Sequence, residues 1–101
     1  MEIYWTHIEF KYLPGSEHFG ECEGGFVYAF VQAKDVRDAL PRFLDEMKAN
    51  KFGTMNVDHV SMYDSIPWET DEDQKKYDAL AEKAKGTTNV ILDTISAYYK
   101  R

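Results

Sequence analysis

Small aliphatic and aromatic residues alternate along residues 26–33, which form the clearest pattern in the chain. The aliphatic set is Val27, Ala29, Val31 and Ala33, and the aromatic set is Phe26, Tyr28 and Phe30. Because successive side chains of a β-strand point to opposite faces, this pattern predicts a strand with one aliphatic and one aromatic face. Neither face is polar, so we expect both faces to need cover.

A helical pattern follows this strand directly. Its apolar residues recur at the helical period and are Val36, Ala39, Leu40, Phe43, Leu44 and Met47. Asp35 suits the N-cap, and Asp38 in the first turn complements the positive end of the helix dipole. The pattern therefore predicts a helix that begins near Val36. Pro41 lies beyond the first turn and is expected to distort this helix locally.

Three further stretches have the composition of strands, because β-branched and aromatic residues predominate in them. These predicted strands are residues 2–12, 54–63 and 89–99. Thr70 as N-cap and a stop at Gly86 delimit a second helix, whose apolar stripe begins at Tyr77. Residues 13–25 are rich in glycine and glutamate and are expected to form a long loop.

The predicted order of elements is β-β-α-β-α-β, in a single α+β domain over residues 1–101. A helical crossover from the second strand to the third leaves room for the first strand between them, a split βαβ arrangement that resembles ferredoxin-like folds. A sheet of four strands is about 19 Å wide, and two helices cover one face of it. We therefore expect a two-layer sandwich with both helices on the aliphatic face.

This arrangement leaves the aromatic face open. The residues expected on it are Phe26, Tyr28, Phe30, Trp5, His7, His59, Tyr63, Leu92 and Tyr98. An exposed apolar patch of this kind usually marks an interface or a ligand groove. The sequence thus predicts a small binding module that forms a homodimer, or binds a protein partner or a small apolar ligand, through these rings. Cover by the loop at residues 13–25 or by a chain end is the alternative.

Charge and cysteine content narrow the possible partners. The formal net charge is −6, which argues against nucleic acid because phosphate binding draws on lysine and arginine. The single cysteine, Cys22, cannot form an internal disulfide and favours a cytoplasmic location. The chain has no apolar run of about 18 residues and no signal-peptide pattern at its start, so no membrane association is expected.

Carboxylates are concentrated in the segment from Asp64 to Asp73, which contains no lysine or arginine. Most of this charge suits the start of the second helix. The segment also fits an acidic inhibitor or immunity-type protein that binds a basic effector, with Tyr63 and Trp68 as aromatic anchors. This inhibitor is the strongest alternative to the binding module.

Catalytic and metal sites have weaker support in the sequence. His7 with Glu9 and His59 with Ser61 are spaced i, i+2 on strands, so His7 and His59 are the candidate acid–base residues of an enzyme. No nucleophile elbow of the Gly-x-Ser-x-Gly type occurs, and a non-enzymatic role is favoured. His18 and Cys22 lack a familiar metal-ligand spacing, so no metal and no cofactor are expected.

Overall fold

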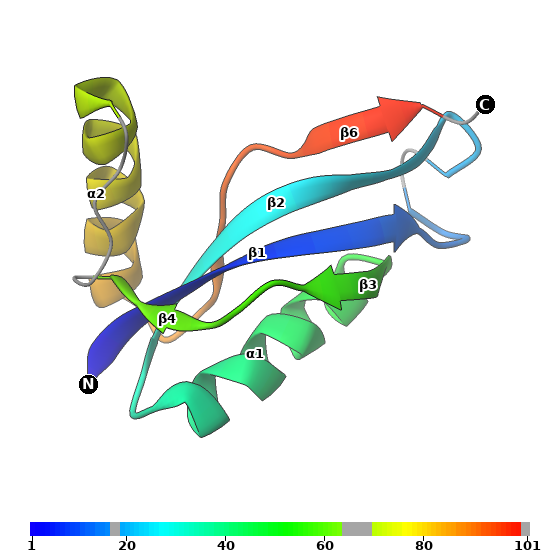
Figure 1. Ribbon diagram of the computed structural model, residues 1–101. Coiled ribbons are helices and arrows are strands. Elements are labelled where there is room, and N and C mark those ends of the chain that lie inside the picture. The colour runs from blue at the N-terminus through cyan, green and yellow to red at the C-terminus, as the bar shows by residue number, and fades with distance from the viewer. Residues whose placement is uncertain (17–18, 64–69, 100–101) are drawn as a thin grey trace.

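The computed structural model describes residues 1–16, 19–63 and 70–99. Its elements are, in order, β1 (Glu2–Tyr12), β2 (Cys22–Ala33), α1 (Val36–Ala49), β3 (Phe52–Val57), β4 (Ser61–Met62), α2 (Asp71–Lys85), β5 (Ile91–Leu92) and β6 (Ser96–Tyr99) (Figure 1). Two helices accompany one open antiparallel sheet, so the predicted α+β class is confirmed.

The sheet has a long central hairpin and divided edges. β1 and β2 pair along nearly their whole length, from Glu2 opposite Ala33 to Lys11 opposite Gly24. β3 and β4 both pair with β1 on one side, and β5 and β6 both pair with β2 on the other. The two strands predicted at residues 54–63 and 89–99 are therefore each present as two shorter pieces, and these pieces form the edges of the sheet.

The first crossover has the predicted split arrangement. β1 lies between β2 and β3, and α1 connects these two parallel strands across it. The second helix instead leaves β4 on one edge and returns the chain to β5 on the opposite edge. The more specific ferredoxin-like topology is therefore not confirmed.

α1 packs against the aliphatic face of the hairpin. Its N-cap is Asp35, whose side chain accepts a hydrogen bond of 2.9 Å from the backbone N of Asp38. Ala39, Phe43 and Met47 are buried, and they pack in a core with the aliphatic residues of β2 and with Tyr4, Ile8, Phe10 and Tyr12 of β1. The predicted start of this helix is confirmed, and the helix continues past Pro41 to Ala49. These three residues of the predicted apolar stripe are buried, whereas Val36 and Leu44 of the same stripe are exposed.

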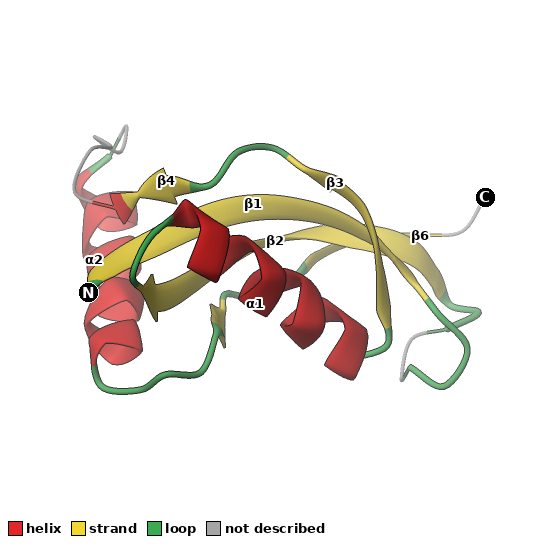
Figure 2. Ribbon diagram, turned by 90° about the horizontal axis from the view of Figure 1, so that it is seen from below, coloured by secondary structure: helices red, strands yellow, loops and turns green. Residues whose placement is uncertain are grey.

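α2 packs against the opposite, aromatic face, so the prediction that both helices cover one face is wrong (Figures 1 and 2). Its predicted N-cap is confirmed, since Thr70 Oγ1 accepts a hydrogen bond from the backbone N of Asp73. The side chains that α2 buries are Tyr77, Ala81 and Ala84, and they pack with Ile3, Trp5, Phe30 and Tyr63. Large rings at this end of the sheet need apolar cover, and the chain supplies that cover itself.

β2 begins at Cys22, four residues before the start that its alternating pattern predicts, so the predicted loop at 13–25 is too long. The reason is the close approach of neighbouring strands to two glycines of β2. A Cβ atom on Gly24 would lie 2.7 Å from Tyr98 Oη, and one on Gly25 would lie 2.9 Å from Ser96 O. These glycines permit close strand packing and do not mark a turn.

Candidate functional site

α2 covers only one end of the aromatic face. Beneath it Phe30 is fully buried, and Trp5 and Tyr63 are nearly so, although all three were expected on an open surface. The ring of Tyr77 packs 6.1 Å from the ring of Phe30, and the Tyr63 hydroxyl donates to the Asp78 carboxylate. Trp5, Phe30 and Tyr63 therefore belong to the core of the molecule.

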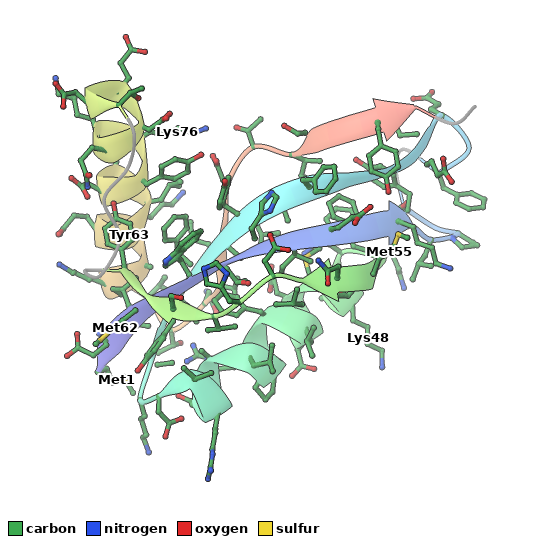
Figure 3. All side chains as sticks on the ribbon, in the orientation of Figure 1. Met1, Lys48, Met55, Met62, Tyr63 and Lys76 are labelled. Atoms are coloured by element: carbon green, nitrogen blue, oxygen red, sulfur yellow. The ribbon has the colours of Figure 1, made fainter. Side chains whose placement is uncertain are left out.

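The other end of this face remains exposed, and we call it the open patch. It consists of His7, Glu9, Phe26, Tyr28, Met55, Asp58 and Tyr98. In Figure 3, Tyr63 marks the covered end beside α2 and Met55 marks the opposite end of the sheet. Phe26 keeps 37% of its surface exposed and Met55 keeps 58%. The open patch is thus a partly apolar surface at one end of the molecule.

His7 lies at the centre of the open patch with both sides of its ring in contact with other groups. It is cross-strand partner to Tyr28, and the two ring centroids are 4.5 Å apart. It also stacks on Phe26, at 5.5 Å and an angle of 11° between the ring planes. Its Nδ1 atom lies 3.0 Å from Asp58 Oδ2, while Asn56 donates to Asp58 Oδ1 at 2.9 Å. The imidazole orientation is therefore fixed by two rings and a carboxylate.

A second polar pair lies beside Phe26. The Tyr98 hydroxyl donates to Glu9 Oε2 at 3.2 Å, and its ring lies 5.8 Å from that of Phe26. Burial, the hydrogen bond to Glu9 and the charges of Glu9 and Glu23 raise the pKa of Tyr98. Its phenol therefore keeps its proton and remains a donor across the physiological pH range.

The structure separates the two candidate catalytic histidines by their contacts. His7 bonds Asp58 rather than the predicted Glu9, whereas His59 packs its ring edge-on against Trp5, with 5.6 Å between the centroids. No described hydrogen bond joins His59 to Ser61. His7 with Asp58 is the better-defined acid–base pair, because a carboxylate at Nδ1 orients the ring and fixes its tautomer.

Two hollows adjoin this face of the sheet. One, of about 220 Å³, is lined by Met55, Lys11, Tyr12, Phe19, Gly20, Cys22 and Glu23, and it shares Met55 with the open patch. The other, of about 470 Å³, lies at the covered end and includes Asp78 and Glu82. Asp78 already accepts from Tyr63 and Gln74, and Glu82 pairs with Lys85, so these carboxylates are engaged within the chain.

The remaining sequence candidates lie elsewhere or outside the described residues. Trp68 and most of the acidic segment fall in residues 64–69, which the structure does not describe, and His18 falls in residues 17–18. Within the described ranges no three histidine, cysteine or carboxylate side chains are grouped as metal ligands. In the same ranges no helix is both long and apolar enough to cross a membrane.

Asp58 and Asn56 are the site residues that the sequence did not reveal. A regular strand over 54–63 would have been needed to predict which side chain meets His7, but the pairing with β1 shifts register between Glu9 and Phe10. After Val57 the chain leaves the ladder, while the backbone N of Asp58 still donates to His7 O at 3.1 Å. That backbone contact brings the Asp58 carboxylate to the imidazole.

Comparison with known proteins adds no identification: no family model, no curated protein and no solved structure matches the chain significantly.

Proposed function

We propose that the protein is a small, non-enzymatic binding module that binds another protein through the open patch. The incomplete cover of the aromatic face carries this proposal. α2 shelters Trp5 and Phe30, whereas Phe26 stays exposed beside His7. Aromatic residues dominate the energetics of many interfaces, because they bury a large area and lose few rotatable bonds on binding.

The extent of the apolar surface supports the same proposal. Met55 and Phe19 are both largely exposed, and both line the hollow that adjoins the open patch at Met55. Met55 also contacts the hydroxyl of Tyr98, whose ring lies 5.8 Å from that of Phe26. A grouped apolar surface with polar groups at its rim is typical of a protein interaction site, whereas single exposed residues need no explanation.

The charge of the open patch favours a different protein over a second copy of this chain. The seven residues of the open patch include the carboxylates of Glu9 and Asp58 and no lysine or arginine, while Lys11 lines the adjoining hollow. Two copies packed through this surface would bring four carboxylates together, which is unfavourable in an interface. The homodimer predicted from the sequence is therefore the less favoured form of the proposal. Binding of a small apolar ligand at this surface also stays a prediction.

Two serine variants, each replacing an apolar residue of similar exposure, test the proposal. Phe26→Ser removes a ring from the open patch, and Leu44→Ser removes a side chain of matched exposure, 38%, from α1. Proteins that co-purify from the native host should be recovered with the wild type and with Leu44→Ser, and lost with Phe26→Ser. Equal recovery with Phe26→Ser would overturn the proposal.

Light scattering over a dilution series tests the homodimer form of the proposal, with Tyr28→Glu as the control variant. A protein that stays monomeric at all concentrations, with and without this substitution, would exclude the homodimer.

Acid–base catalysis is the second candidate, and the 3.0 Å contact between His7 Nδ1 and Asp58 favours it. A carboxylate in this position holds an imidazole ready to accept a proton at Nε2. If a turnover is found, His7→Gln should abolish it and Asp58→Asn should reduce it, whereas His59→Gln should leave it unchanged. A turnover that survives His7→Gln removes this candidate.

The acidic inhibitor remains an alternative that rests on the segment from Asp64 to Asp73. Its described part, the first turn of α2, carries Asp71, Glu72 and Asp73. Charge reversal at Asp71 and Asp73 distinguishes this alternative from the open patch, because it should abolish partner recovery only if this segment makes the contact.

A cytoplasmic location is proposed because the single cysteine of the chain cannot form an internal disulfide.

A further inference from the structure

Neither carboxylate of the open patch pairs with a lysine or arginine among the residues that the structure describes. Glu9 accepts a hydrogen bond from a phenol, and Asp58 contacts an imidazole and an amide. In the part of the chain that the structure describes, no lysine or arginine lies within ion-pair distance of either. A carboxylate accepts about four hydrogen bonds, so both retain capacity for a charged donor.

The rings beside these carboxylates are suited to a flat cation. His7 and Phe26 are stacked, with Tyr28 and Tyr98 at either side. The face of an aromatic ring carries negative potential, and the planar guanidinium of arginine stacks on such a face while it donates to carboxylates. A lysine ammonium makes the charge contact but does not stack.

The same combination already holds a cation elsewhere on this face. The Lys76 ammonium lies 5.1 Å from the centroid of the Tyr77 ring and 3.1 Å from Asp93 Oδ2. Tyr77 packs on Tyr28, and the backbone N of Asp93 donates to Tyr28 O, so this group borders the open patch. There Lys76 supplies the cation, whereas beside Phe26 no described lysine or arginine accompanies the rings and carboxylates.

We propose that the open patch binds an arginine side chain on a basic segment of a partner protein, stacked on the exposed ring of Phe26 and paired with Glu9 and Asp58. This inference rests on the proposed function and specifies its partner. Glu9 lies two residues after His7 on β1, and residues with this spacing on a strand are about 7 Å apart on the same face. Asp58 contacts His7, so the two carboxylates lie on the same part of the surface. The guanidinium of arginine carries five N–H donors in a fork, so a single arginine has donors for both carboxylates.

Peptide titration followed by protein amide chemical shifts tests this inference directly. The probe is a short capped peptide with two arginines among glycines, and the control peptide has citrulline, which is neutral but similar in shape. The arginine peptide should shift the amides of β1 and β2 around His7 and Phe26. The citrulline peptide should bind at least about tenfold more weakly, and a lysine peptide should fall between the two.

Conservative variants separate the specific contacts from overall charge. Glu9→Gln and Asp58→Asn should each weaken arginine-peptide binding roughly threefold, and the double variant about tenfold. Asp45→Asn on α1 removes one negative charge at an exposed site, as each single variant does, and it should leave the affinity for the arginine peptide unchanged. Equal binding of the citrulline peptide, or equal affinity in the double variant, would overturn the inference.

The outcomes also separate this inference from the proposed function. Partner recovery that is lost with Phe26→Ser but intact in the Glu9→Gln, Asp58→Asn double variant means that the open patch binds a partner without a cation. The proposed function then stands and the inference is wrong. A concentration-dependent dimer that dissociates in Tyr28→Glu would assign the patch to a second copy, which also overturns the inference.

Discussion

Thr6 places a hydroxyl inside the core, on the face of β1 that packs beneath α1. Its side chain is fully buried, and Oγ1 has no hydrogen-bond partner among the described residues. A buried hydroxyl without a partner costs about 1–3 kcal/mol of desolvation. Valine has nearly the same shape, so Thr6→Val should raise the free energy of unfolding by roughly 1 kcal/mol, as measured by urea denaturation.

Thr54→Val is the control for this variant. Thr54 lies exposed on β3, so the same change removes no buried polar group and should alter stability by less than about 0.5 kcal/mol. A loss of stability in Thr6→Val would show that the hydroxyl is satisfied in solution, for example by a buried water molecule.

At the residue scale, the sequence predicted contacts wherever the backbone was regular. The alternation in β2 placed Val27 and Phe30 on opposite faces, as the structure confirms. Gly24 was interpreted as part of a loop because glycine breaks strands in most contexts. Its actual role depends on the ring of Tyr98, 74 positions later in the chain, and local pattern carries no information about such a neighbour.

At the scale of elements, caps and periodicity predicted both helices with their starting residues, but they did not predict the face that α2 covers. Ala81 and Ala84 are small enough to pack on either side of the sheet. The position of α2 is set by tertiary contacts, in particular the stacking of Tyr77 on Phe30 and the hydrogen bond from Tyr63 to Asp78. These partners are distant in the sequence, so helix periodicity cannot identify them.

The Tyr63–Asp78 contact makes the attachment of α2 dependent on pH. Hydrogen bonds from Tyr63 and Gln74 lower the pKa of Asp78 below its usual value near 3.8. A carboxyl with a lowered pKa in the folded state contributes stability above its unfolded pKa, and that stability is lost as pH falls through the folded pKa. Tyr63→Phe should therefore be less stable than the wild type at pH 7, and the difference should shrink below about pH 4.

Urea denaturation of both proteins at pH 7, 5 and 3 measures this effect. Asp78→Asn supplies the control background, because an amide does not titrate in this range. In that background the cost of Tyr63→Phe should be the same at all three values of pH. If the stability lost in Tyr63→Phe is the same at all three pH values when Asp78 is present, the hydrogen bond from Tyr63 is not what lowers the pKa of Asp78.

At the scale of the whole molecule, stability should be concentrated in the central hairpin. β1 and β2 are paired over ten positions and covered by α1, whereas β5 pairs with β2 at two positions, Ile91 and Leu92. Short edge pieces open locally without global unfolding, so their amides exchange faster than those of the core. Native-state hydrogen exchange should therefore show Val31 at least about 100-fold more protected than Leu92.

The same experiment connects stability to the binding surface. β6 carries Tyr98, which forms the margin of the open patch and holds Glu9 by its hydroxyl. A ligand that binds the folded surface stabilises every segment that must be in place for binding. Addition of the arginine peptide should thus slow amide exchange in β6. Exchange in β3, where Met55 is the residue that contacts Tyr98, should change less. Uniform slowing across all strands would mean that β6 opens only with the whole molecule, and the edge would then belong to the same cooperative unit as the hairpin.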